Sequence, residues 1–134
     1  MRKKKVAIVL FIEGDKILIQ DRRPWDKYGF DYGFFGGKIE EGETPEQALK
    51  REIKEELNIE LNDFKFIKHT KKQIPELDLE IEFYTYESSI PDLNKITCNE
   101  GKPFLIDFKN ALELRFNPAD LELLKEIYEH IRKK

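Results

Sequence analysis

One short segment of the chain, between Gly36 and Glu60, gathers an unusual number of carboxylates. Glu52, Glu55 and Glu56 lie three and four residues apart, so a helix places them on one side. Like charges at this spacing repel each other by roughly 0.2–0.5 kcal/mol per pair. We expect no lysine or arginine to offset them on that side, so a bound divalent cation is the simplest way to relieve the repulsion. The alternative is an ordinary solvated acidic surface.

Magnesium is the ion that fits these ligands best. Mg²⁺ prefers oxygen ligands and is commonly held by one or two carboxylates, with water and substrate phosphate completing the shell. The calcium-loop pattern of EF-hands is absent, and the only histidines, His69 and His130, have no zinc-ligand spacing. The sequence therefore predicts a site for Mg²⁺, or alternatively Mn²⁺, with a backbone carbonyl of Gly36-Gly37 as a further ligand.

A helix with clear end signals must position the acids. Thr44 is a good N-cap, Pro45 suits the first helical position, and Gln47 completes a capping box. We expect the helix to run to about Leu57, with Asn58 in the left-handed conformation that ends helices.

The three acids border the predicted buried side of this helix. Leu49, Ile53 and Leu57 fall on one arc, which predicts an apolar stripe against the core. Ala48 falls in the middle of the acidic arc, where we expect its small side chain to leave room for a ligand. Acids at the border of the core, not opposite it, favour a site over a plain surface.

The other elements suggest one sheet packed by helices. The patterns predict strands at residues 5–13, 16–23, 64–70, 77–89 and 102–108, with a short strand and turn at 31–40 and a hairpin turn at Gly14–Asp15. A last helix is expected to start after the cap Asn117 and to pack on the sheet through Leu121, Leu124, Ile127, Tyr128 and Ile131. The rings of Trp25, Tyr28, Phe30 and Tyr32 mark a loop that either stacks a base or covers the sheet.

Composition limits the function classes. The 134 residues suit one domain, residues 1–134, and the net charge of −3 does not suggest a nucleic-acid polymer or a membrane surface as partner. The longest apolar run, residues 6–12, is far shorter than the roughly 20 residues of a membrane-spanning helix. Because the single cysteine, Cys98, cannot form an internal disulfide, we expect a reducing, cytoplasmic location. Monomer and homodimer both remain open.

The acidic segment between Gly36 and Glu60 resembles the signature of Nudix hydrolases, G-x5-E-x7-R-E-U-x-E-E-x-G-U, in which U is aliphatic. Gly37, Glu43, Arg51-Glu52-Ile53, Glu55-Glu56 and Ile59 match it in order, and Asn58 replaces the family's last glycine. So many fixed positions over 23 residues make the resemblance specific. It covers the helix and its preceding loop, and it is weaker elsewhere.

Within the family the chain is most similar to the MutT type, which hydrolyses nucleoside triphosphates. The matching segments suggest Glu100 in 99–103 as an added metal ligand and Asp120 in 116–120 as a base contact, where that branch has asparagine. They also suggest Arg23, Gly36, Gly37 and Lys38 as substrate contacts. Gly33 and Phe35 depart from the branch by replacing a glutamate and a proline.

The resemblance implies an α/β (α+β) Nudix fold, a mixed sheet between helices, and metal-dependent attack of water on a nucleoside diphosphate linkage. The expected substrate is a small nucleotide, most simply a (d)NTP, including 8-oxo-dGTP-like oxidised purines, cleaved to a monophosphate and pyrophosphate. The implied metal and catalytic groups are Glu52, Glu55, Glu56 and Glu100, with the Gly36 carbonyl as a further metal ligand. Either Glu52 or Glu100 is able to activate the water. Arg51 and Glu43 are expected to pair structurally. Alternatives are an ADP-ribose, dinucleoside polyphosphate or nucleotide-sugar hydrolase, and a catalytically silent Nudix module that senses a nucleotide.

Overall fold

The computed structural model describes residues 1–23, 30–99 and 101–132. The strands in these ranges are β1 (Arg2–Glu13), β2 (Lys16–Asp21), β3 (Tyr32–Gly33), β4 (Phe35–Lys38), β5 (Lys65–Ile74), β6 (Leu79–Ser88) and β7 (Lys102–Asp107). The helices are α1 (Pro45–Leu57), α2 (Phe108–Ala111) and α3 (Pro118–Arg132), with a 3₁₀ turn η1 (Pro75–Leu77). In the described ranges, no helix has both the length and the apolar character needed to cross a membrane.

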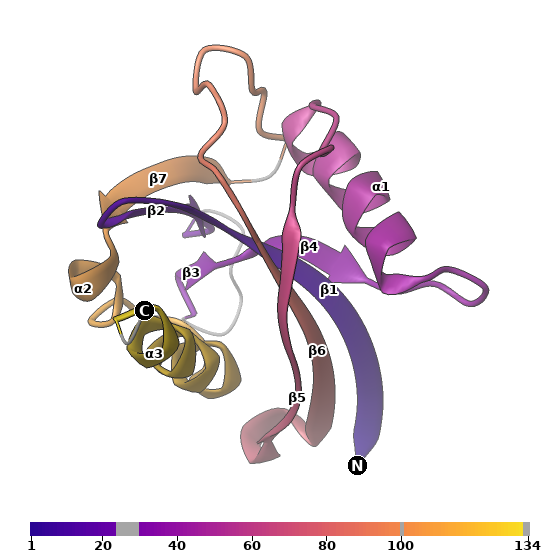
Figure 1. The fold of residues 1–134 in the computed structure, drawn as a ribbon. Coiled ribbons are helices and arrows are strands. Elements are labelled where there is room, and N and C mark those ends of the chain that lie inside the picture. The colour runs from indigo at the N-terminus through magenta and orange to yellow at the C-terminus, as the bar shows by residue number, and fades with distance from the viewer. Residues whose placement is uncertain (24–29, 100, 133–134) are drawn as a thin grey trace.

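The strands form one mixed sheet with β1 at its centre (Figure 1). Neighbouring strands run in the order β3-β2-β1-β6-β5, while β4 pairs with β1 and β7 pairs with β2. β1 and β6 are parallel, and the other pairs are antiparallel. The predicted hairpin is confirmed, since Glu13 and Lys16 face each other across its turn.

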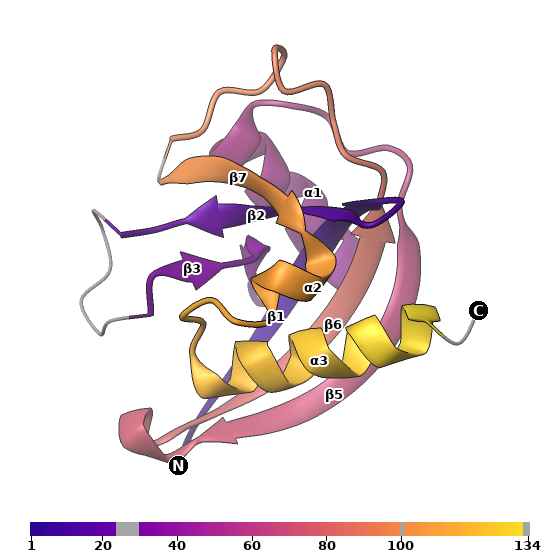
Figure 2. The ribbon, with the colours of Figure 1, turned by 90° about the vertical axis from the view of Figure 1, so that its left-hand side faces the viewer.

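Helices cover the two faces of this sheet, with α1 on one and α3 on the other (Figures 1 and 2). The apolar run of β1 serves both faces, because alternate side chains of a strand point in opposite directions. Ala7, Val9 and Phe11 pack with α1, whereas Val6, Ile8 and Leu10 pack in the cluster under α3. The expected fold, a mixed sheet between helices, is confirmed.

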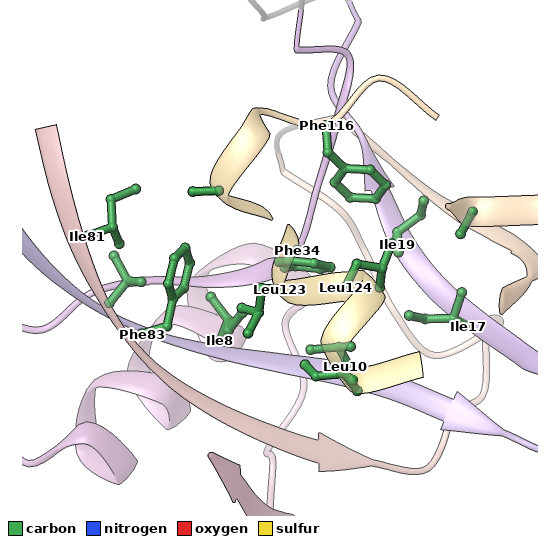
Figure 3. Packing of buried hydrophobic residues seen from close by; sticks show 14 of the residues in the cluster. Ile8, Leu10, Ile17, Ile19, Phe34, Ile81, Phe83, Phe116, Leu123 and Leu124 are labelled. Carbon is green, nitrogen blue, oxygen red and sulfur yellow. The ribbon is translucent and has the colours of Figure 1, made fainter. Parts of the chain in front are cut away.

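The cluster under α3 includes rings from outside the helix. Phe34 and Phe116 lie with ring centroids 5.4 Å apart, beside Leu123 and Leu124 of α3 (Figure 3). The sequence pattern placed Leu121 in the buried stripe, but Leu123 is fully buried while Leu121 is only half-buried. Periodicity alone did not show that the contact side of α3 is turned toward Leu123.

Two further expectations were wrong. Ala48 does not leave room for a ligand, because it is fully buried in the core between α1 and the sheet. The strand predicted to end at residue 70 continues to Ile74, where pairing with β6 overrides the polar sequence "KKQ".

Candidate active site

The caps of α1 fix the orientation of its acids. Thr44 Oγ1 accepts a hydrogen bond from the backbone N–H of Gln47 at 3.1 Å, and Gln47 Oε1 accepts one from Thr44 N–H at 2.9 Å. At the other end Asn58 has φ 59° and ψ 35°, the left-handed conformation expected there. The helix therefore has defined ends, and Leu49 and Ile53, both fully buried, determine which side faces the sheet.

Two glycines of β4 lie directly against the acids. A Cβ atom on Gly37 would lie 2.5 Å from Cδ of Glu52, so the missing side chain is what admits this carboxylate. Gly36 N–H donates to Oε1 of Glu56 at 3.1 Å. Gly36 has φ 132°, and a Cβ there would lie 2.2 Å from the carbonyl oxygen of Ala7, so only glycine fits. Glu52 and Glu56 are thus held where α1 meets β4.

Arg51 connects the acidic helix to the loop before it. Its Nε and Nη2 atoms donate to the two carboxylate oxygens of Glu43 at 2.8 and 2.9 Å, and Nη2 also donates to the carbonyl of Lys38 at 3.0 Å. The hydrogen bonds from Arg51 lower the pKa of Glu43 to about 2. This pairing holds the loop to the helix.

The same arginine corrects the expectation that no cation offsets the acids. Nη1 of Arg51 lies 2.9 Å from Oε1 of Glu52 and 3.6 Å from Oε2 of Glu55. The helical wheel failed here because an arginine side chain is long enough to reach across to the neighbouring arc. Part of the like-charge repulsion is therefore relieved within the protein.

The donor set still fits a hard divalent cation. Glu52 and Glu56 present carboxylate oxygens beside the Gly36–Gly37 backbone, and Mg²⁺ needs only one or two carboxylates when substrate phosphate and water complete its shell. Glu55 is more exposed, at 60% of its side-chain surface. Within the described ranges no three His, Cys, Asp or Glu side chains form a ready cluster, and Glu100 lies outside those ranges.

A pocket of about 330 Å³ opens on the α3 side of the sheet. Its apolar lining comes mainly from β1 and β6, and its polar lining is Lys4, Arg22, Asn117 and Asp120. Phe30 and Tyr32 of the ring-rich loop also line it, whereas Trp25 and Tyr28 lie outside the described residues. Since Gly36 and Gly37 line the same pocket, it adjoins the backbone under the acids. The volume falls in the range of small-molecule sites.

Asp120 stands in this pocket at the start of α3. Its backbone N–H donates to Asn117 Oδ1 at 2.8 Å, and its carboxylate accepts from Asn117 Nδ2 at 2.9 Å. Burial raises the pKa of Asp120 to about 7, although Asn117, Lys4 and Arg22 all act to lower it. Near neutral pH this side chain can therefore accept or donate a hydrogen bond, depending on its protonation.

Two predicted substrate contacts, Arg23 and Lys38, are not among the residues that line the pocket. Arg22, which the sequence resemblance pairs with Arg23 without giving it a substrate contact, lines the pocket. Arg23 pairs with Asp21, with Nη2 of the arginine 2.6 Å from Oδ2 of the aspartate. Its guanidinium lies 5.7 Å from the ring centroid of Tyr32, a pocket residue. Lys38 is exposed at the end of β4.

Comparisons with known proteins agree with this arrangement. The NUDIX domain family matches residues 1–131. The 8-oxo-dGTP diphosphatase of Escherichia coli strain K12 is 33% identical over 88 residues, covering 65% of this chain and 68% of that protein. The CTP pyrophosphohydrolase of the same strain is 27% identical over 122 residues, covering 90% and 87%. The solution structure of the E. coli ORF135 protein has a TM-score of 0.74 and 26% identity, covering 98% of this chain and 92% of that one.

Proposed function

The chain belongs to the Nudix hydrolase family, and we propose that it hydrolyses a nucleoside triphosphate to a nucleoside monophosphate and pyrophosphate with Mg²⁺. The observation that supports this most directly is the shared Gly36–Gly37 backbone. One side of it receives the carboxylates of Glu52 and Glu56, and the same residues line the pocket that holds Asp120. A nucleotide with its base in the pocket can thus present its phosphates to the acids.

The proposal gives each predicted site residue a role. Glu52 and Glu56, with Glu55 and the Gly36 carbonyl, would hold the Mg²⁺, which supplies charge neutralisation of the phosphate oxygens when bound. The attacking water adds to phosphorus as the anhydride P–O bond breaks, and either Glu52 or Glu100 takes its proton. Arg51 holds Glu43 and Glu52 in place, a supporting contact of the kind that orients metal ligands.

The pocket supplies the choice of base. Its apolar lining offers contact area to a ring, and Asp120 with Asn117 offers hydrogen bonds at one side. The two E. coli relatives act, by name, on an oxidised purine nucleotide and on a pyrimidine nucleotide. We therefore take (d)NTPs, with 8-oxo-dGTP and CTP first among them, as candidate substrates. If Asp120 contacts the base, Asp120→Asn changes the ranking of nucleotides more than the rate on the best one.

A nucleotide panel tests the proposal. Purified protein is incubated with 8-oxo-dGTP, dGTP, CTP, dCTP, ADP-ribose, a dinucleoside polyphosphate and a nucleotide sugar, with Mg²⁺, with Mn²⁺ or with EDTA. We expect metal-dependent release of pyrophosphate and monophosphate from a triphosphate. Cleavage of ADP-ribose, the dinucleotide or the sugar nucleotide alone would reject the substrate class. Nucleotide binding without turnover would instead indicate a sensing module.

A further inference from the structure

The carbonyl groups at the end of α1 are bonded to a segment that follows β6, residues 97–99 (Figure 1). Asn99 makes two of these contacts: its backbone N–H donates to the carbonyl of Glu56 at 3.0 Å, and its side-chain amide donates to the carbonyl of Glu55. Both acceptors belong to residues that carry proposed metal-site carboxylates. A residue distant in sequence thus fixes the backbone of two acids.

A second side-chain amide, on Asn58 at the end of α1, also bonds this helix to residues 97–99. Asn58 Nδ2 donates to the carbonyl of Thr97 at 2.9 Å, and Thr97 N–H donates to the carbonyl of Leu57 at 3.0 Å. The Nudix signature has glycine at the position of Asn58, and glycine allows the left-handed turn but has no side-chain amide to donate. The replacement therefore adds a contact, and does not merely tolerate the turn.

The electrostatics of a helix end explain why these donors matter. The last carbonyls of a helix lack internal partners and carry a partial negative charge of about half an electron, which disfavours acids in the last turn. Glu55 and Glu56 stand in that turn. Donors on their own carbonyls reduce the local negative charge and prevent fraying of the turn.

We propose that Asn58 and Asn99 are positioning residues for the hydrolysis, an inference that rests on the proposed function. Through residues 97–99 they fix the last turn of α1, so that the carboxylate of Glu56 stays within hydrogen-bond reach of Gly36 N–H. Glu56 is then held at its backbone by Asn99 and at its carboxylate by Gly36. Neither asparagine touches the substrate in this account.

General anchoring of the segment does not explain these contacts. Ile90, Ile96 and Cys98 from the same connection already pack against the apolar cluster under α1. Asn58 and Asn99 are exposed, and their side chains add hydrogen bonds to this apolar packing. Their loss should leave the segment attached but the acids less precisely placed.

Asn58→Gly and Asn99→Ala test the inference, and Asn94→Ala, an exposed asparagine of the same connection, is the matched control. Hydrogen exchange of the Gly36 amide is measured in metal-free protein, because this amide reports the position of the Glu56 carboxylate. Steady-state kinetics on the best nucleotide give kcat and KM separately. Loss of partners that orient metal ligands costs about 10–100-fold.

We expect faster Gly36 exchange and a kcat about tenfold lower in both variants, with KM changed less than twofold and Asn94→Ala unchanged. Should Asn99→Ala not fold, Asn58→Gly carries the test, because glycine keeps the left-handed turn. Unchanged Gly36 exchange and kcat in the folded variants would overturn the inference, as would a loss of kcat that follows thermal unfolding alone. If the wild type cleaves no nucleotide, the proposed function fails, and the Gly36 exchange still decides this inference.

Discussion

Gly37→Ala is the substitution whose effect follows most directly from the structure. The added Cβ would lie 2.5 Å from Cδ of Glu52 and 2.6 Å from its Oε2, while ordinary contact begins at 3.4 Å. The Glu52 carboxylate must therefore move by about 0.9 Å. A misplacement of about 1 Å costs roughly a hundredfold in rate, which corresponds to about 2.7 kcal/mol in the barrier.

The fold should survive this change. The atoms in the way belong to the end of a flexible side chain, and the φ of Gly37 is outside the left-handed region. Replacing glycine by alanine at a compatible position stabilises a protein by about 0.4–1 kcal/mol through the unfolded state. We expect a kcat about a hundredfold lower with a thermal midpoint equal to or above that of the wild type.

Gly14→Ala is the matched control, because its effect should be the reverse. An added Cβ there meets nothing within 4 Å, but the φ of 61° strains alanine. We expect a stability lower by roughly 1–2 kcal/mol, and therefore a lower thermal midpoint, with an unchanged kcat. Calorimetry and pyrophosphate release measure both quantities. A Gly37→Ala protein with kcat within threefold of the wild type would refute the proposed placement of Glu52.

Three other predictions concern single groups. Asp120 binds its proton more tightly in the folded state than in the unfolded one, so stability should fall as pH rises from about 4 to about 7. Asp120→Asn should then stabilise the protein at pH 8 by about 1–3 kcal/mol and have little effect at pH 4, and equal effects at both pH values would contradict the shift. Arg51→Lys loses the paired contact with Glu43, so we expect kcat/KM to be about 10–100-fold lower, and unchanged kinetics would count against the role of this pair. The variant should also lose less stability than the wild type on acidification from about pH 4.5 toward pH 2. Thr85 is fully buried, and its hydroxyl has no hydrogen-bond partner in the described part of the chain, so Thr85→Val should raise the unfolding free energy by about 1 kcal/mol, whereas a decrease would indicate a partner for that hydroxyl.

The acidic helix was predictable because local signals specify it. Thr44, Pro45 and Gln47 determine its start, Asn58 its end, and the spacing of Leu49, Ile53 and Leu57 its buried side. These signals act within a few residues and do not depend on the rest of the fold. The strands at the centre of the sheet were predictable for the same reason, through their apolar runs.

Contacts that depend on three-dimensional geometry were not predictable. The reach of Arg51 to Glu52 depends on side-chain geometry, and the burial of Ala48 depends on how closely α1 approaches β1. The bond from Asn58 to Thr97 joins residues 39 apart, and no periodicity indicates such a pair. Arg22, and not its neighbour Arg23, lines the pocket. Both residues lie beyond the last residue of β2, where strand alternation no longer indicates which side chain faces the pocket.

Hydrolysis by Glu56→Gln, compared with Glu60→Gln, tests the central claim most directly. Glutamine at position 56 can still accept the Gly36 hydrogen bond but loses the charge, whereas Glu60 is exposed beyond the helix end and pairs with Lys54. The account predicts that Glu56→Gln is folded and inactive with Mg²⁺ on the best nucleotide, while Glu60→Gln retains wild-type kcat/KM. Equal Mg²⁺-dependent activity in the two variants would contradict it.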